Sequence, residues 1–184
     1  MTRVVLHGAG VTLRPYRSGE LDVMEAAMRT DEAREWLPLG PPPRQELRRR
    51  VEARGLLSDG RVDLVIEVDG RMVGEIDGRH PRWALPPGVW ELGITVFARA
   101  DRGKGYGREA LRLMCERLFA EESAHRVSLT TDMENTAMRA VAERVGFRLE
   151  GVLRSFMPTA QERRDYAMYA MTKDDWENER TTWT

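Results

Sequence analysis

The feature that most restricts the fold is a pair of alternating runs joined by an Asp-Gly dipeptide. In the first run, apolar residues occupy every second position from 62 to 68. After Asp69-Gly70, the same alternation continues through Met72, Gly74 and Ile76. A period of two indicates β-strands, and an Asp-Gly pair between two such runs is typical of a two-residue hairpin. These residues predict an antiparallel hairpin, which disfavours a wholly parallel, doubly wound sheet.

The rest of the chain alternates between strand-like segments with a period of two and helix-like segments with a period of about 3.6. Strands are predicted over 89–97, 127–131, 147–153 and 166–172, and helices over 20–30, 44–54, from Gly105 onward and from Asn135 to Gly146. The last helix is expected to bury Ala137, Met138, Val141, Ala142 and Val145 and to end at Gly146 as a C′ residue. This order predicts an α/β domain of the α+β type. Its sheet is expected to be mixed and mostly antiparallel, with one parallel pair.

Composition limits the classes of protein to consider. The chain has 184 residues, of which 41% are hydrophobic and 32% charged, which predicts one globular domain over 1–184. A formal net charge of −1 argues against a nucleic-acid partner that needs a broad basic face. The sequence has neither a membrane-length apolar run nor a signal-like start, so the expectation is a cytoplasmic protein with no membrane partner.

The segment with the most chemical information is Arg102–Gly107, in which glycines alternate between a predicted strand and a predicted helix. Glycines allow tight backbone curvature and close approach of a ligand, and a helix N-terminus favours anions. A phosphate- or pyrophosphate-binding turn is therefore predicted. The segment does not fit a nucleotide-hydrolysing P-loop. A dinucleotide-binding fingerprint is a weak alternative. It needs an acidic residue about 20 positions after the glycines, and Asp132 lies farther along the chain than that. A glycine-rich turn without a ligand is the third possibility.

Together with several distant segments, this turn resembles the Arg/Gln-x-x-Gly-x-Gly/Ala signature of the GCN5-related N-acetyltransferase (GNAT) superfamily. The resemblance covers nearly the whole chain. It is carried by 11–15, 90–94, 105–111, 135–137 and 145–147, and the segments 150–154 and 165–176 resemble the branch that acetylates ribosomal-protein N-termini. The resemblance implies a GNAT fold, with a mixed sheet splayed between its fourth and fifth strands and about four flanking helices.

The resemblance also implies the acyl donor and its binding residues. The donor would be acetyl-CoA, and no metal would be needed. Val96 and Phe97 would face the pantetheine arm, and Asn135 would hydrogen-bond it from the other side. The backbone N–H groups of Arg102, Gly103, Lys104, Gly105, Tyr106 and Gly107 would hold the pyrophosphate. A primary amine would then attack the thioester directly, with the N–H near Val96 as oxyanion donor.

An alkyl amine is protonated at pH 7, so the reaction needs a base. Glu91 matches the family's strand-four carboxylate and is the expected base, although a surface Glu paired with an Arg is an equal alternative. Asp132 is the reserve base, with a loop or N-cap role as its structural alternative. Relatives often carry a Ser or Tyr as proton donor at the positions that are Met138 and Ala142 here. Neither residue can donate a proton, so the general acid is unassigned.

The expected activity is transfer of acetyl to a primary amine, either a protein N-terminus or a small molecule. Two alternatives stay open, namely a non-catalytic acyl-CoA-binding module and transfer of a longer acyl group such as succinyl. A homodimer is possible, but no sequence feature decides it.

Several other residues are expected to be structural. Cys115 lies on an apolar helix stripe, and His7, His80 and His125 share no metal-ligand spacing, which predicts no metal site. Core packing is expected for Met24, Met28, Trp36 and Trp83, with the lining of an acceptor pocket as the alternative. The run Arg48–Arg50 is interpreted as a solvated helix face.

Overall fold

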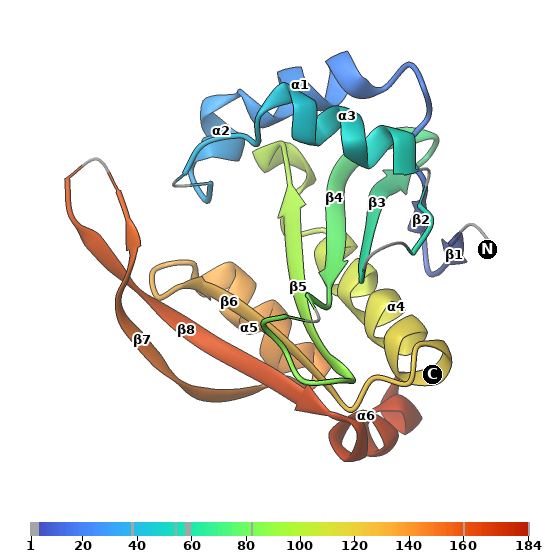
Figure 1. Ribbon diagram of the computed structural model, residues 1–184, viewed down its shortest axis with the longest axis vertical. Coiled ribbons are helices and arrows are strands. Elements are labelled where there is room, and N and C mark those ends of the chain that lie inside the picture. Colours follow the sequence, from blue (N-terminus) through green and yellow to red (C-terminus); the bar gives the residue numbers. More distant parts are fainter. Residues whose placement is uncertain are drawn as a thin grey trace.

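The structure is a computed structural model that describes residues 4–37, 39–53, 55–57, 60–81, 83–159 and 161–183, with only the backbone of Thr182. Within these ranges the chain forms one eight-stranded sheet with the order β1-β2-β3-β4-β5-β6-β8-β7 (Figure 1). The strands are β1 (Leu6–His7), β2 (Thr12–Arg14), β3 (Arg61–Val68), β4 (Arg71–Arg79), β5 (Val89–Val96), β6 (Arg126–Asp132), β7 (Arg148–Pro158) and β8 (Arg163–Thr172). All neighbouring pairs are antiparallel except β5 and β6, which are parallel. The predicted mixed, mostly antiparallel fold is confirmed.

The predicted hairpin is confirmed in detail. β3 and β4 pair antiparallel and are joined by Asp69 and Gly70, whose φ angles are 50° and 75°. Positive φ at both central positions is the type I′ geometry that matches the twist of a two-residue hairpin. The sequence therefore determines this turn locally, because Asp and Gly adopt that conformation more readily than bulky residues do.

Six α-helices and two 3₁₀ turns accompany the sheet in the described ranges. The helices are α1 (Leu21–Met28), α2 (Asp31–Arg34), α3 (Arg44–Ala53), α4 (Tyr106–Glu121), α5 (Thr136–Val145) and α6 (Lys173–Glu179), and the turns are η1 (Arg99–Asp101) and η2 (Arg180–Thr182). About four helices were expected. The additional ones, α2 and α6, are too short for an apolar period and begin instead at the side-chain caps of Thr30 and Thr172.

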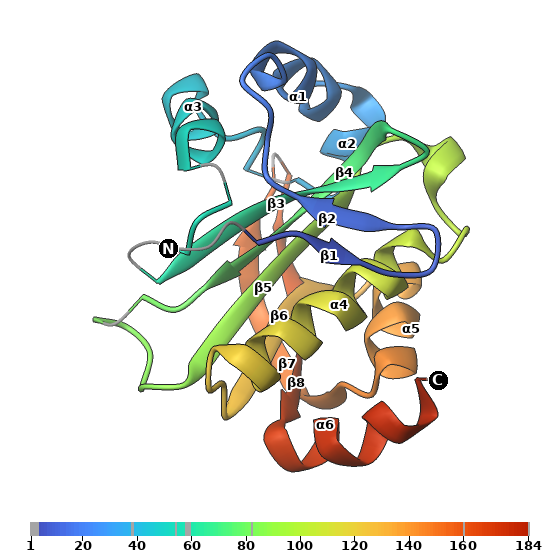
Figure 2. The same ribbon diagram turned by 90° about the vertical axis from the view of Figure 1, so that its right-hand side faces the viewer.

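The sheet packs helices on both faces. The larger apolar core lies between the sheet and the helices α4 and α5, and it includes the predicted stripe Leu111, Met114, Cys115 and Leu118. The smaller core joins Met24, Met28, Leu47 and Val51 of α1 and α3 to Val65 of β3 and Phe97. Figure 1 shows α1–α3 gathered at one end of the strands, and Figure 2 shows α4 and α5 beside each other. We call the side of the sheet that carries the larger core the α4 face, and the side that carries the smaller core the α3 face.

Three local predictions are corrected. Arg48 and Arg49 are exposed, but Arg50 is buried on the α3 face, so the interpretation of this run as wholly solvated is wrong. Ala137 is exposed, since it lies in the first turn of α5, where the helix leaves the core. Trp83 is 88% exposed in the β4–β5 connection and is not a core residue. Arg54, the predicted end of α3, lies outside the described residues.

Candidate active site

The glycine-rich turn connects η1 to the start of α4. Gly103 and Gly105 have φ angles of 75° and 87°, which is left-handed backbone that glycine adopts without strain. A Cβ placed on either residue would meet no atom within 4 Å, so the turn opens to solvent. At Gly107 a Cβ would lie 3.8 Å from side-chain atoms of Ile94 and Val96. The first two glycines therefore shape the turn, whereas a Cβ at Gly107 would make only ordinary contacts with β5.

The turn presents a series of free backbone donors. The first helical bond from the turn is donated by Glu109 N to Gly105 O, at 3.0 Å. Among the described residues, the N–H groups from Gly103 through Arg108 donate to no protein acceptor. Free N–H groups at a helix N-terminus attract anions through the helix dipole. Arg102 differs from the expectation, because its N–H already donates to Arg99 O, at 3.0 Å.

Two charged residues fix the shape of this turn. The guanidinium of Arg102 donates to the carbonyls of Val96 (3.3 Å) and Phe97 (3.2 Å) and to Glu35 (2.8 Å). Its side chain thus connects the end of β5 to the region after α2. Asp101 is buried and accepts two hydrogen bonds from Arg71, which holds the pKa of Asp101 below its ordinary value. These contacts organise the turn in advance of any ligand.

The sheet opens beside this turn, as predicted. β5 and β6 pair only at Val89↔Arg126, Trp90↔Val127 and Glu91↔Ser128, and beyond Glu91 the two strands separate (Figure 1). Phe97 N donates to Val73 O on the β4 side, so strand alternation directs the N–H of Val96 into the gap. The side chain of Phe97 is buried in the smaller core. Of the two residues expected to face the pantetheine arm, Val96 alone has its N–H directed there.

The two predicted carboxylates have different surroundings. Glu91 is exposed at the point where β5 and β6 separate, opposite Arg79 and Ser128, and it makes no hydrogen bond or ion pair with the described residues. Asp132 is buried at the end of β6. Its Oδ1 accepts from Glu134 N at 2.8 Å, and its Oδ2 lies 3.2 Å from Arg164 Nη1. Glu91 is therefore available to a ligand, whereas both oxygens of Asp132 are engaged.

α5 follows β6, the strand that borders the gap on the side opposite β5. Asn135 is the N-cap of α5, with its Oδ1 accepting from Met138 N at 3.0 Å. This bond uses the side-chain oxygen, while its amide nitrogen has no hydrogen-bond partner among the described residues. Met138 is half-buried and Ala142 fully buried. Neither position supplies a proton donor.

Sequence reasoning missed a buried network of charges on the α3 face. Arg50 Nη1 donates to both oxygens of Glu75 at 2.9 Å, and Tyr16 Oη donates to Glu75 at 2.6 Å. Arg61 donates to Asp63 at 2.7–3.0 Å, and Arg61 and Arg79 flank Asp77. The signal was present in the alternating charges at 61, 63, 75, 77 and 79. Only the packing of α3 over these strands reveals that this polar face is buried.

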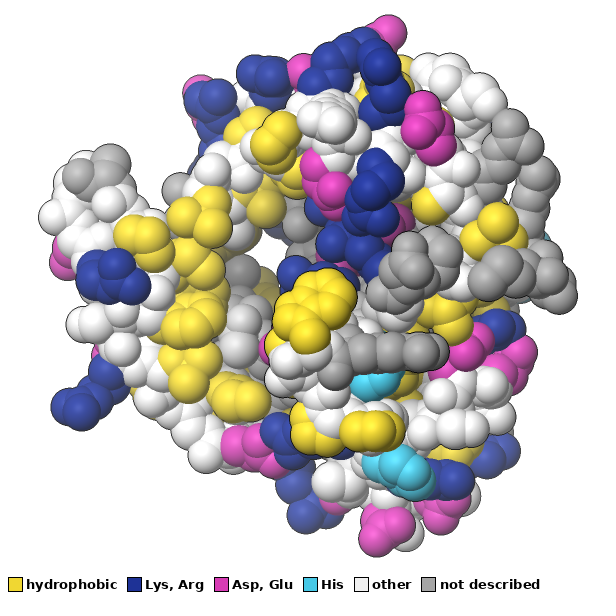
Figure 3. Space-filling model, in the orientation of Figure 1, with side chains coloured by type: hydrophobic (Ala, Val, Ile, Leu, Met, Phe, Trp, Pro, Cys, Tyr) yellow, Lys and Arg dark blue, Asp and Glu magenta, His cyan; other side chains and the backbone are white. Residues whose placement is uncertain are grey.

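Figure 3 shows a hollow in the face of the sheet that is turned toward the viewer in Figure 1. Hydrophobic side chains lie on its side toward the β7–β8 arm, and charged side chains lie on the opposite side. The strand register accounts for the apolar side, because Leu153, Tyr166 and Met168 share the face of Glu91 through Ser128 and Asp132. Tyr166 also packs against Phe156, with ring centroids 5.6 Å apart.

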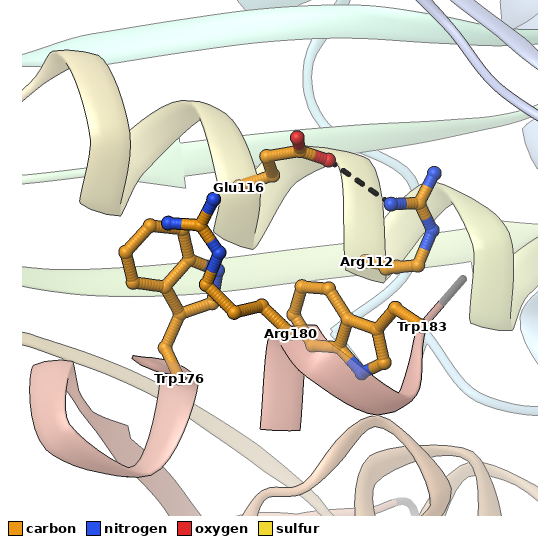
Figure 4. A pocket seen from close by; sticks show the side chains of 5 residues that line it. All are labelled: Arg112, Glu116, Trp176, Arg180 and Trp183. Atoms are coloured by element: carbon orange, nitrogen blue, oxygen red, sulfur yellow. Dashed lines mark hydrogen bonds and ion pairs between the residues drawn. The ribbon is translucent and has the colours of Figure 1, made fainter. Parts of the chain in front are cut away.

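A separate cavity of about 210 Å³ lies between α4 and the C-terminal helix (Figure 4). Its lining residues are Arg112, Glu116, Trp176, Arg180 and Trp183. Arg180 lies over the Trp176 ring at 4.7 Å and Arg112 over the Trp183 ring at 5.8 Å. None of the predicted site residues lines this cavity, so it is distinct from the glycine-rich turn.

Within the described ranges, no group of three or more His, Cys, Asp or Glu residues is arranged to hold a metal ion. No described helix has the length and apolarity needed to cross a membrane.

Comparisons with solved structures give the fold. An acetyltransferase of the GNAT family from Bacillus anthracis superposes with a TM-score of 0.77 at 22% identity, covering 93% of this chain and 99% of that one. RimJ from Mycobacterium smegmatis, in complex with CoA-disulfide, superposes with a TM-score of 0.74 at 24% identity, covering 94% and 87%.

Sequence comparisons give the family. The uncharacterised N-acetyltransferase YnaD of Bacillus subtilis (strain 168) is 32% identical over 88 residues, which is 48% of this chain and 51% of that protein. The chain matches about half the length, or less, of its curated relatives. The model of the acetyltransferase (GNAT) domain matches residues 11–148, and the chain therefore belongs to the GNAT acetyltransferase family.

Proposed function

We propose that this chain is a single catalytic domain that transfers an acetyl group from acetyl-CoA to a primary amine. The observation that carries the proposal is the open glycine-rich turn with its free N–H groups beside the gap between β5 and β6. A diphosphate suits this turn because it accepts several N–H bonds at the positive end of α4. The gap gives an extended, amide-containing arm a strand edge to pair with.

The geometry supports the following roles for the donor-binding residues. The backbone from Gly103 through Gly107 holds the diphosphate, with the Lys104 ammonium nearby and 52% exposed. Arg102 acts through its side chain, which fixes the end of β5. The N–H of Val96 pairs with the arm or stabilises the oxyanion, and the free amide nitrogen of Asn135 faces the arm from α5. Phe97 contributes its buried ring to the wall behind β5.

The reaction needs no enzyme nucleophile. The amine attacks the thioester carbonyl, the C–N bond forms, and the C–S bond breaks. Glu91 is the proposed base, since it is exposed and unpaired among the described residues at the point where the strands separate. Asp132 is the weaker candidate because Glu134 N and Arg164 occupy its oxygens. The acceptor is a protein N-terminus or a small amine.

A second candidate function is a non-catalytic module that binds acyl-CoA. Met138 and Ala142 favour it, because they leave the expected thiolate proton donor missing. A longer acyl group such as succinyl is a further variant of the transferase. The transferase and the non-catalytic module share the donor site and differ only in whether an amine is acylated.

The test combines calorimetry with acetyl-CoA and a thiol-release assay over a panel of primary amines. Binding together with amine-dependent thiol release supports the transferase. Binding without turnover of any amine supports the module, and absence of binding removes both.

The donor site is tested separately with Gly105→Glu. The variant places a negative charge where the diphosphate is expected. The left-handed φ of Gly105 strains any side chain, but the surroundings are open, so the fold should persist while affinity for CoA falls by about 100-fold or more. Gly40→Glu is the matched control, because Gly40 also has a positive φ (74°) and open surroundings but lies in the α2–α3 connection. Equal affinity in the two variants would remove the turn as the binding site.

A further inference from the structure

We propose that Asp77 is a second catalytic carboxylate, which accepts a proton from the attacking amine beside Glu91. This inference rests on the proposed amine acetylation and adds a residue to the same site. It starts from the strand register. Asp77 of β4 is paired with Gly93 of β5, and Glu91 of β5 is paired with Arg79 of β4. Paired residues share a face, so Asp77 and Glu91 are diagonal neighbours, whose Cα atoms are typically about 7–8 Å apart.

The carboxylate of Asp77 reaches across β5 because Gly93 has no side chain. A Cβ on Gly93 would lie only 2.6 Å from Asp77 Oδ1. Asp77 therefore occupies the space above β5 between Glu91 and Thr95, on the stretch of β5 that has no β6 partner. An amine placed to attack a thioester held in this gap would lie over the same stretch.

Asp77 is buried and incompletely paired. Its Oδ2 lies 3.1 Å from Arg79 Nε and 3.8 Å from Arg61 Nη2, yet both Oδ2 and Arg79 Nε are buried without a hydrogen bond to any described residue. Unsatisfied buried polar atoms are costly, so such a pair calls for an explanation. Oδ2 and Arg79 Nε are each other's ion-pair partner and are enclosed, so the oxygen left to accept from a ligand N–H is Oδ1, which lies over Gly93 and makes no hydrogen bond with a described residue.

The surroundings also tune the proton affinity. Burial raises the pKa of Asp77 to about 6, against the opposing effect of the nearby guanidinium groups. A base works best with a pKa near the operating pH. The charged groups around it are Arg79 and Glu75 on β4, Arg61 and Asp63 on β3, and Arg50 on α3, while β5 contributes Gly93 directly opposite and Glu91 diagonally.

Two carboxylates match the proton balance of the reaction. An ammonium that becomes an amide nitrogen loses two protons, one before attack and one after the C–N bond forms. Asp77 accepts the first and Glu91 the second. As the C–S bond breaks, one proton ends on the coenzyme sulfur and the other passes to bulk water. No other residue therefore has to act as the proton donor that relatives carry as Ser or Tyr at the positions of Met138 and Ala142.

Neighbouring buried acids do not share these properties. Asp63 is saturated by Arg61, with three contacts of 2.7–3.0 Å, and Glu75 is saturated by Arg50 and Tyr16. Asp63→Asn is therefore the matched control for Asp77→Asn, because both remove a buried charge from the same face.

The experiment measures kcat/KM against pH for the full chain with acetyl-CoA and an amine that the wild type acetylates. Wild type is expected to show an acid limb near pH 6. Asp77→Asn is expected to lose about 100-fold in kcat/KM and to lose that limb, with unchanged CoA affinity. Asp63→Asn should keep the limb. In addition, ¹³C NMR of labelled Asp carboxyls should show a titration near pH 6 that is absent from Asp77→Asn.

A second pair of variants tests the geometry without removing the carboxylate. Gly93→Ala should displace Asp77 Oδ1 and lower kcat/KM by about 10- to 100-fold. Gly78→Ala should not, because its nearest contact would be an ordinary 3.4 Å on the opposite face. Full activity and an unchanged acid limb in Asp77→Asn would overturn the inference alone. A wild type that acetylates no amine would overturn the proposed function and this inference with it.

Discussion

The two faces of the sheet are stabilised in different ways. The α4 face buries a continuous apolar core, in which Leu111, Met114 and Leu118 are at most 1% exposed. The α3 face buries a smaller apolar cluster together with a network that includes Arg50, Asp63, Glu75 and Asp77. A buried ion pair often stabilises a fold less than apolar residues of the same volume would. The α4 face therefore stabilises the fold efficiently, while the α3 face keeps charges where the proposed chemistry takes place.

The largest stability loss on the α3 face is expected from breaking its saturated network. Glu75→Gln removes the negative charge that pairs with Arg50, and it leaves one accepting oxygen where Arg50 and Tyr16 now share two. Burial and the Glu75 carboxylate raise the pKa of Tyr16 well above its ordinary value, so the phenol stays protonated and donates. Removing one partner of a buried pair costs about 3–5 kcal/mol. Urea unfolding should show this loss, and a loss below about 1 kcal/mol would show that the network is not a stabilising unit.

On the α4 face, Leu111→Ala should cost a similar or slightly smaller amount, about 2–5 kcal/mol, through lost transfer energy and the cavity left behind. The difference between the faces should appear in function. Leu111 lies away from the proposed acceptor site, so kcat/KM below the unfolding transition should stay near that of the wild type. A parallel fall in kcat/KM would show that the two faces are coupled.

The structure also shows which parts of this comparison the sequence could predict. The α4 face was predicted well, because its apolar residues follow the helical period of 3.6 and their burial follows from pattern alone. The Asp69-Gly70 hairpin, the glycine-rich turn and the Gly146 cap were predicted because each depends on local backbone conformation. The opening between β5 and β6 came from the family resemblance rather than from the residues themselves.

The α3 face was not predictable in the same way. A charged position on a strand faces either solvent or another element, and the alternation is the same in both cases. Arg50 was assigned to a solvated run because its partner Glu75 lies 25 residues away on another element. The role of Gly93 could not be found from the sequence either, since it depends on its pairing with Asp77 across β4 and β5. In each case the missing information is which distant element the residue packs against or pairs with.

A smaller effect of opposite sign is expected for Asp77→Asn. Burial raises the pKa of Asp77 from 3.8 to about 6. Between about pH 4 and pH 6 the unfolded chain has lost a proton that the folded chain keeps, so the free energy of unfolding decreases as pH rises through this window. Asn does not titrate, so the variant does not lose stability as pH rises through this window. Asp77→Asn should therefore be more stable than wild type by about 1–3 kcal/mol at pH 7, with no such gain below about pH 4.

Thermal unfolding at pH 4 and pH 7 measures this difference, and Asp63→Asn serves as the control that should lose stability at pH 7. A variant with greater stability and lower activity would identify Asp77 as a group whose burial costs stability for the sake of function. If Asp77→Asn is destabilised at pH 7, Asp77 is a structural ion-pair partner of Arg79 and Arg61.

The smallest effect is expected from Arg44, which lies on the same helix as Arg50 and is also paired with acids. Arg44 contacts Asp22 and Glu25 of α1, but its side chain is 48% exposed, compared with 9% for Arg50. Water and salt screen an exposed pair, and holding two long side chains in place costs entropy. Arg44→Ala should leave the urea midpoint nearly unchanged, whereas Arg50→Ala should lower it about as much as Glu75→Gln. Equal losses at the two arginines would mean that the number of ion pairs, rather than their burial, determines how α3 is held on the sheet.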